Sequence, residues 1–421
     1  MNSVDHRVKG SFTDAFFFGS VIALLGVVSF CPPFILERRP FLVLGCLLFV
    51  FAALVANKGF AILRKSDLPL WIFLAAFGMN VLFARDKSAA WNTYINLSVT
   101  MLCVYYVTAE AVTSARKFDI LVKMICLFTV LSALLGIIDT VAGWNPLYEF
   151  YLQNPYYDRY KDSGFLRAMS THCNPAILGT YLIAGCPFLI LVARSQKDMP
   201  NKIAGAVMLA MVIAAVLLTC SRGVFIALTG SLLLLFAFLN RNKTGYIVLI
   251  LAAVLIFIVV CSFLPYPFAK YGIQGFVFSG DGIISQYRLS RVAMAYDMFA
   301  SAPFSGVGFQ HFRLLFNGYN PLPYPETYEF MIADNMYLTI LAETGAVGFL
   351  GFCVFVFFVF KKAAALKRAR INSYLLMAGI AALLINMGAF ELFYWFNPYI
   401  YFCLLTGLVE ALWRTPPQTR T

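Results

Sequence analysis

Residues 244–263, with the sequence TGYIVLILAAVLIFIVVCSF, contain no charged side chain. A helix of about 20 apolar residues crosses the hydrocarbon core of a bilayer, which is about 30 Å thick. This stretch is therefore long enough to span a membrane. The segment that follows it, residues 264–333, is polar and holds Arg288, Arg291, His311 and Arg313. We expect the fold to be built from apolar membrane spans like residues 244–263, joined by polar connections like residues 264–333.

The whole chain has the composition of a membrane protein. Of its 421 residues, 61% are hydrophobic and only 12% are charged, and the mean hydropathy is +0.79. Soluble domains are about 45–50% apolar and about 25% charged. Because backbone polar groups find no water in lipid, apolar segments of this length must be helices. The sequence predicts an all-α, polytopic helical bundle that forms one domain, residues 1–421.

Apolar segments recur along the chain and mark about twelve expected transmembrane helices. Two of the connections between them are long, namely residues 143–173 and residues 264–333, and both are expected on the same face of the membrane. The expected spans are residues 14–36, 41–57, 68–84, 90–112, 119–142, 174–193, 203–220, 222–240, 244–263, 334–360, 372–390 and 393–413.

Charges in the short connections indicate the orientation, because short cytoplasmic loops are rich in Lys and Arg. If the N-terminus is cytoplasmic, every cytoplasmic connection contains at least two such residues. Arg38, Arg39, Arg85 and Lys87 lie on the other side and run against this trend. The net charge of +12 is thus explained mainly by membrane topology, and no nucleic acid is needed as a partner.

Cysteine and histidine usage indicates neither a disulfide framework nor a metal site. Most of the 10 Cys lie inside apolar segments, and none belongs to a CxxC pair. The three His are far apart in the sequence, whereas metal ligands are usually clustered. No glycine-rich nucleotide-binding loop is present. We therefore expect no metal and no cofactor.

Four short patterns hold the polar residues that are candidates for chemistry, and all four are expected on the face opposite the cytoplasm. The third includes an expected amphipathic helix over about residues 286–299. The patterns are Phe165-Leu166-Arg167; Thr219-Cys220-Ser221-Arg222-Gly223; Arg288 and Arg291 followed by Gly306-Val307-Gly308; and Asp334-Asn335 followed by Glu343-Thr344-Gly345.

In their order and their common side, these patterns resemble the O-antigen ligase and O-antigen polymerase superfamily over about residues 167–351. Its members are bacterial membrane glycosyltransferases that use an undecaprenyl-diphosphate-linked glycan as donor. The resemblance implies a site on the periplasmic face of the inner membrane. It assigns Arg167, Arg222 and Arg288 to the diphosphate, and places Asp334 and Asn335 beside the reacting sugar. In ligases of the family, the residue at the position of Asp334 is usually His.

The residue types suit this chemistry on physical grounds as well. Arginine stays protonated and binds phosphate in a bidentate manner, and fixed cations stabilise charge that develops on a diphosphate leaving group. A carboxylate or an imidazole can take the proton of an acceptor hydroxyl, and we rank Asp334 above His311 for this role. We expect Asp334, Arg288 and Arg222 to be catalytic. The expected substrate-binding residues are Arg167, Arg291, His311, Asn335 and Glu343.

Each of these residues also has a structural explanation. The arginines could snorkel to lipid headgroups, and Arg288 and Arg291 could form the solvated face of a surface helix. Asp334 could simply cap the helix that follows it. Glu343 lies inside an expected span, where a carboxylate is costly and tends to be functional, but it could instead pair with an arginine.

Three classes of function remain open at the level of sequence. A transferase would attach the glycan either to a lipid A core sugar, as a ligase does, or to a second lipid-linked repeat, as a polymerase does. A transporter or flippase of lipid-linked sugars would be expected to have two related halves and broken helices, and the sequence indicates neither. A noncatalytic scaffold for envelope assembly is the third class.

Overall fold

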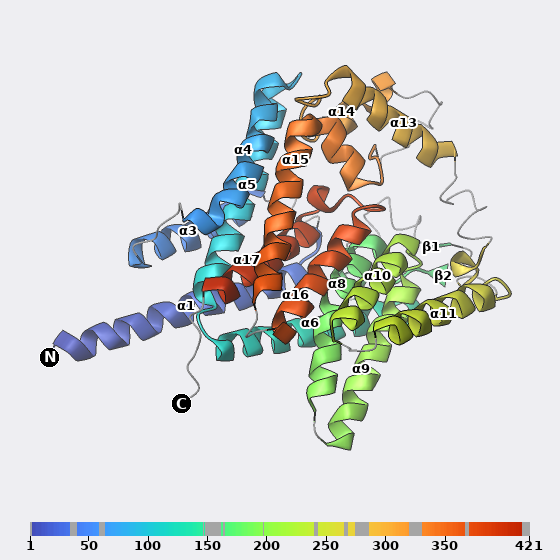
Figure 1. Ribbon diagram of the computed structural model, residues 1–421, viewed down its shortest axis with the longest axis horizontal. Helices are drawn as coiled ribbons and strands as arrows, with labels where there is room; N and C mark the ends of the chain where they lie inside the picture. Colours follow the sequence, from blue (N-terminus) through green and yellow to red (C-terminus); the bar gives the residue numbers. More distant parts are fainter. Residues whose placement is uncertain are drawn as a thin grey trace.

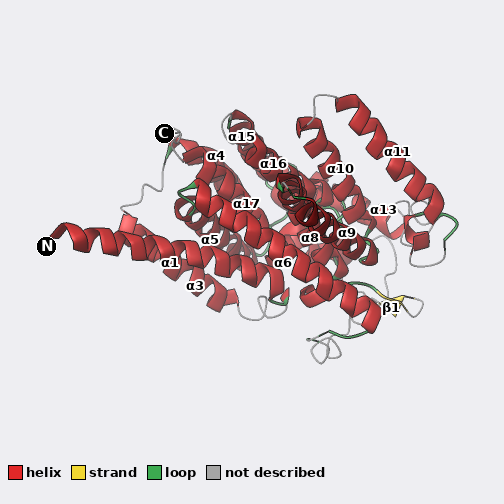
Figure 2. Ribbon diagram, turned by 90° about the horizontal axis from the view of Figure 1, so that it is seen from below, coloured by secondary structure: helices red, strands yellow, loops and turns green. Residues whose placement is uncertain are grey.

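The computed structural model describes residues 2–33, 40–58, 64–145, 147, 161–162, 165–196, 198–239, 243–264, 268–273, 286–319, 331–366 and 370–414. Over these residues the protein is a bundle of helices with one small hairpin (Figures 1 and 2). The hairpin pairs β1 (Lys161–Asp162) with β2 (Phe165–Leu166) in antiparallel register. The all-α, polytopic membrane fold predicted from the sequence is confirmed.

Each of the twelve expected spans overlaps an α-helix, with boundaries that differ by several residues for some of them. By length and hydropathy, six helices within the described residues are able to cross a membrane, starting with Lys65–Phe83 and ending with Met336–Ala365, and two shorter apolar helices accompany them. The helices are α1 (Asn2–Phe30), α3 (Pro40–Lys58), α4 (Leu68–Phe83), α5 (Lys87–Ala111), α6 (Ala115–Ala142), α8 (Pro175–Ser195), α9 (Met199–Leu218), α10 (Arg222–Leu239), α11 (Lys243–Cys261), α15 (Met336–Ala365), α16 (Arg370–Asn386) and α17 (Phe396–Arg414).

Two further helices, α13 (Gln286–Ser301) and α14 (His311–Tyr319), lie within the segment that was expected as a long loop. Helix α13 matches the amphipathic helix predicted over about residues 286–299. Four short 3-10 helices complete the described secondary structure. These are η1 (Lys65–Asp67), η3 (Ser170–His172), η4 (Phe268–Tyr271) and η5 (Leu392–Tyr394).

The core of the bundle surrounds α8 and α17. Every residue of α17 from Asn397 to Ala411 is buried, and α8 is buried over most of its length. Helix α17 packs against α5, α16 packs against α10 and α8, and α15 packs against α4. In contrast, α9 and α11 expose large apolar side chains such as Ile203 and Leu255, as expected for helices that face lipid.

Helix α15 contains a break that the sequence did not predict. Gly345 has φ +65° and ψ −170°, so the helical path changes direction there. A Cβ on Gly345 would lie 2.4 Å from the backbone carbonyl of Phe304 and 2.6 Å from the nitrogen of Gly306. Only a glycine in this conformation lets the two backbones approach so closely. The break therefore depends on contact with residues 303–308.

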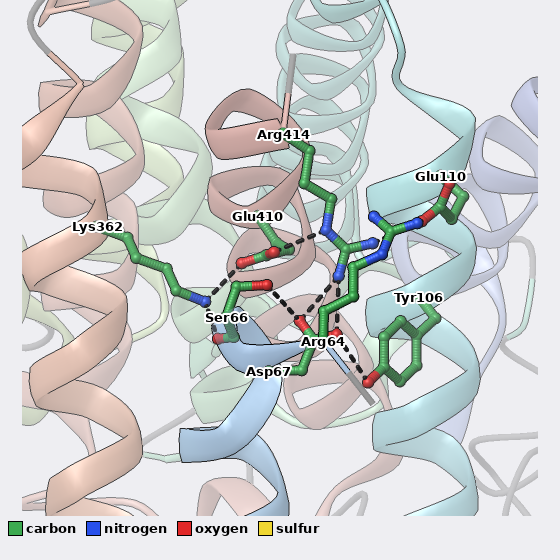
Figure 3. A network of polar contacts seen from close by, with 8 residues as sticks. All are labelled: Arg64, Ser66, Asp67, Tyr106, Glu110, Lys362, Glu410 and Arg414. Atoms are coloured by element: carbon green, nitrogen blue, oxygen red, sulfur yellow. Dashed lines mark hydrogen bonds and ion pairs between the residues drawn. The ribbon is translucent and has the colours of Figure 1, made fainter. Parts of the chain in front are cut away.

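Ion pairs join four helices at the end of α15 that lies away from Gly345 (Figure 3). The guanidinium group of Arg414 on α17 donates to both carboxylate oxygens of Asp67, at 2.8 and 3.0 Å, and to Glu410 at 2.7 Å. Lys362 on α15 donates to Glu410 at 2.6 Å. Glu110 on α5 also accepts from Arg414. We call Asp67, Glu110, Lys362, Glu410 and Arg414 the ion-pair cluster.

Candidate functional site

Asp334 and Asn335 have different structural roles at the start of α15. The side chain of Asn335 caps the helix, because its Oδ1 accepts hydrogen bonds from the backbone nitrogens of Tyr337 and Leu338, at 3.1 and 3.2 Å. Asp334 does not make this cap. It has φ +55°, a left-handed conformation that non-glycine residues adopt rarely and that often marks functional sites. The side chain of Asp334 is therefore available for another contact.

That contact is an ion pair with Arg291 of α13. Nη1 of Arg291 donates to Oδ2 of Asp334. The side chain of Arg291 is only 8% exposed, whereas that of Asp334 is 32% exposed. Arg291 is thus not on the solvated face of its helix, and it fixes the direction of a carboxylate that solvent or a ligand still reaches. Arg288, one turn earlier on α13, is half-buried.

Glu391, which the sequence analysis did not select, contacts the residue that follows Asp334. Its Oε1 accepts hydrogen bonds from the backbone nitrogen of Asn335, at 3.3 Å, and from Oγ1 of Thr339, at 2.7 Å. The residue is fully buried, and Oε2 has no hydrogen-bond partner. Burial raises the pKa of Glu391 to about 7, and the nearby charge of Asp334 acts in the same direction, while the hydrogen bond from Thr339 acts against it.

Arg167 contacts the turn between α9 and α10, just before Arg222. Helix α9 ends at Leu218 and α10 begins at Arg222, with Cys220 at φ +51° between them. Nε of Arg167 donates to the carbonyl oxygen of Thr219 in this turn, at 2.8 Å. The backbone nitrogen of Ala168 donates to the carbonyl oxygen of Leu218, at 3.0 Å. The segment that carries Arg167 is thus fixed to the turn that leads into Arg222.

The segment after α16, residues 387–391, connects this turn with the start of α15. A Cβ on Gly223, next to Arg222, would lie 2.6 Å from Cβ of Ala389, so α10 begins in close contact with this segment. The backbone nitrogen of Met336 donates to the carbonyl oxygen of Met387, at 2.8 Å. Glu391 completes the link through Asn335. Residues from all four sequence patterns are thus joined by a continuous set of contacts around residues 387–391.

Glu343 joins the Glu343-Thr344-Gly345 pattern to the Gly306-Val307-Gly308 pattern. Its backbone carbonyl oxygen accepts from the nitrogen of Gly308, at 3.0 Å, and from Nδ2 of Asn80, at 2.6 Å. Its carboxylate accepts from the backbone nitrogen of Phe312, at 2.9 Å, and from the hydroxyl of Tyr394. Glu343 is fully buried and its Oε2 has no hydrogen-bond partner. The carboxylate therefore joins α14 to η5. Its hydrogen-bond partners are Phe312 and Tyr394, and not the arginine that the sequence allowed as an alternative.

His311 is buried at the start of α14, and both ring nitrogens have partners in the protein. Nε2 accepts from the backbone nitrogen of Asp86, at 3.2 Å, and Nδ1 lies 3.0 Å from the carbonyl oxygen of Phe309. A neutral ring protonated at Nδ1 satisfies both contacts. In this arrangement His311 positions the connection between α4 and α5. Its expected role in binding substrate remains a prediction.

A family model described as O-Antigen ligase matches residues 206–353. Over these residues, which we call the O-antigen ligase segment, the chain is similar to that family. The resemblance to the ligase and polymerase superfamily that the motifs predicted is thereby confirmed. No curated protein sequence matches the chain. The O-antigen ligase segment covers Arg222, Arg288, Arg291, Asp334 and Glu343, but it includes neither Arg167 nor Glu391.

Outside the O-antigen ligase segment, Glu391 is the residue that sequence reasoning missed. A signal was present, because a carboxylate flanked by Phe390 and Leu392 is unusual in a chain this apolar. Within the described part of the chain, no three His, Cys, Asp or Glu residues are grouped so that they could hold a metal ion.

Proposed function

We propose that the protein is a glycosyltransferase that moves a glycan from undecaprenyl diphosphate to an acceptor sugar at the periplasmic face of the bacterial inner membrane. One observation carries this proposal. The Asp334 carboxylate, fixed by Arg291, belongs to the same set of contacts as the turn that carries Arg222 and the segment that carries Arg167. The match to the O-antigen ligase family supports the same class of function.

In the proposed reaction, the bond between the anomeric carbon of the donor sugar and the diphosphate oxygen breaks. A new bond forms between that carbon and the acceptor hydroxyl oxygen. The acceptor proton passes to the carboxylate of Asp334, which is partly exposed. Undecaprenyl diphosphate leaves with the additional negative charge, and Arg167, Arg222 and Arg288 are proposed to stabilise it.

The other candidate residues have positioning roles in this proposal. Arg291 directs the carboxylate of Asp334, and Asn335 fixes the start of α15. Glu343 and His311 hold the segments on either side of α14. Such positioning matters because displacing a catalytic group by about 1 Å can cost about 100-fold in rate.

We propose a ligase that uses a lipid A core sugar as acceptor, and a polymerase that uses a second lipid-linked repeat as the alternative. Asp334 favours the alternative, because it stands where ligases of the family usually have His. The two activities differ in the acceptor alone, so they are separated by supplying each acceptor to the same preparation.

The test is transfer by the purified full-length protein in detergent, with undecaprenyl-diphosphate-linked glycan and either acceptor. We expect one of the two products to grow. Replacing Arg222 or Arg288 by Ala should raise the activation free energy of transfer by about 2–4 kcal/mol, the usual effect of losing one charge-stabilising donor. Lys202→Ala, an exposed change on α9, is the control and should transfer as the wild type does.

Two results would overturn the proposal. If neither acceptor gives product with active donor, the transferase assignment is wrong and a carrier or a scaffold becomes the better explanation. If the arginine variants transfer at the wild-type rate, the diphosphate is bound elsewhere.

A further inference from the structure

Helix α13 exposes a stripe of five apolar residues, with the exposed Asp297 and Ser301 along one side of it. Its exposed apolar residues are Leu289, Val292, Ala293, Tyr296 and Ala300. Their spacing of three, four, seven and eleven positions from the first places them on one side of a helix. Leu289 is 54% exposed and Tyr296 is 67% exposed. We call these five residues the apolar stripe.

The opposite face of α13 is the one that packs on the protein. Met294 and Met298 are fully buried, and they form a core cluster with Phe312, Phe316 and Ala342 from α14 and α15. Arg291 lies on this buried face. In a helix that covers a protein in water, the outward face carries polar residues. The apolar stripe is thus the reverse of what an aqueous environment favours.

The stripe continues into a surface that belongs to the membrane spans. Phe304, four positions after Ala300, is 76% exposed. Its carbonyl oxygen accepts from the backbone nitrogen of Val347 in α15, at 3.3 Å, and Leu350, one turn further along α15, is 61% exposed. On the neighbouring α4, exposed Leu82 and Phe83 follow Asn80, which donates to the backbone of Ser305. Exposed apolar side chains thus flank the place where residues 304–305 contact α4 and α15.

We propose that α13 is an interfacial helix whose apolar stripe lies in the lipid headgroup and upper acyl region of the bilayer. Figure 1 shows α13 at the upper edge of the molecule, beyond α15. Tyr296, in the middle of the stripe, and Arg288, at its margin, are residue types that favour this region. A helix in this position holds Arg288, Arg291 and Asp334 at the depth of lipid phosphates.

The proposal is independent of the transferase function, so its test uses no substrate. A nitroxide spin label is placed singly at Val292 or Tyr296 in the full-length protein, in a background without other cysteines. The protein is reconstituted in vesicles of phosphatidylethanolamine and phosphatidylglycerol. Collision of the label with oxygen, which concentrates in lipid, is compared with collision with a water-soluble nickel chelate. Labels at Leu255 on α11 and at Lys202 on α9, both exposed, serve as lipid and water references.

We expect both α13 labels to collide severalfold more with oxygen than with the nickel chelate, as the Leu255 reference does. If they resemble the Lys202 reference instead, the stripe faces water and the proposal is wrong. If they collide weakly with both reagents, another protein surface covers the stripe, which also overturns the proposal. Activity of the labelled proteins is not needed for any of these outcomes.

Discussion

At the scale of single residues, the site depends on two carboxylates with different environments. Asp334 is partly exposed and paired with Arg291, whereas Glu391 is buried and accepts hydrogen bonds from Asn335 and Thr339. Glu391 therefore fixes the backbone directly after Asp334, whose left-handed conformation is otherwise unfavourable. In the proposed reaction Asp334 takes the acceptor proton, and Glu391 holds the backbone beside it in place.

The buried carboxyl of Glu391 predicts a specific pH dependence of stability. Its pKa is about 7 in the folded protein, above the ordinary value of 4.5. Between these values the folded state holds a proton that the unfolded chain has released, so stability falls as pH rises through this window, by an amount on the order of 3 kcal/mol. Glu391→Gln removes the free-energy cost of ionising a buried carboxyl. Thermal unfolding in detergent should show the stability of the variant rising relative to that of the wild type from pH 5 to pH 8.

A matched control separates this effect from general electrostatics. Asp297→Asn changes an exposed carboxylate on α13, and its stability should follow the wild-type pH profile. A constant difference between Glu391→Gln and the wild type at all pH values would show that Glu391 does not titrate in this window.

At the scale of elements, sequence predicted the helices well and their breaks poorly. Runs of apolar residues are sufficient to locate spans, because a bilayer requires a minimum helix length. The charged patterns were also visible, since arginines stand out in an apolar chain. The partners of Glu391 lie more than 50 positions away, and the break at Gly345 depends on residues 303–308. Contacts of this kind come from tertiary packing, which apolar periodicity does not record.

Gly345→Ala tests whether the break in α15 is needed. The new Cβ would meet the backbone carbonyl of Phe304 at 2.4 Å, in a left-handed conformation that Ala tolerates poorly. We expect a loss of stability of about 1–3 kcal/mol, with weakened transfer because Asp334 and Glu343 lie on the same segment. Gly318→Ala in α14 is the control, since a Cβ there has no atom within 4 Å. Equal melting temperatures for both variants would show that the break is not required.

At the scale of the whole molecule, the candidate site and the ion-pair cluster lie toward opposite ends of α15. The cluster ties the last turn of α17 to α4, α5 and α15 through groups that are almost completely buried, with Asp67 and Glu410 at 0% exposure. Buried ion pairs add little to stability compared with apolar packing, but removing one partner leaves an uncompensated charge. The cluster should therefore matter for assembly of the bundle and not for chemistry at the site.

Arg414→Ala tests this separation between assembly and chemistry. It removes the ion-pair partner of the buried Asp67 and one of the two partners of Glu410, and we expect a loss of stability of about 3–5 kcal/mol. The remaining folded protein should transfer glycan at the wild-type rate per molecule, because the ion-pair cluster with Arg414 lies toward the opposite end of α15 from Asp334. Melting temperature and folded yield in detergent measure the first effect, and transfer normalised to folded protein measures the second. Lys361→Ala, beside the cluster but exposed, should change neither quantity. A variant that keeps its melting temperature but loses transfer would instead connect the cluster to the site along α15.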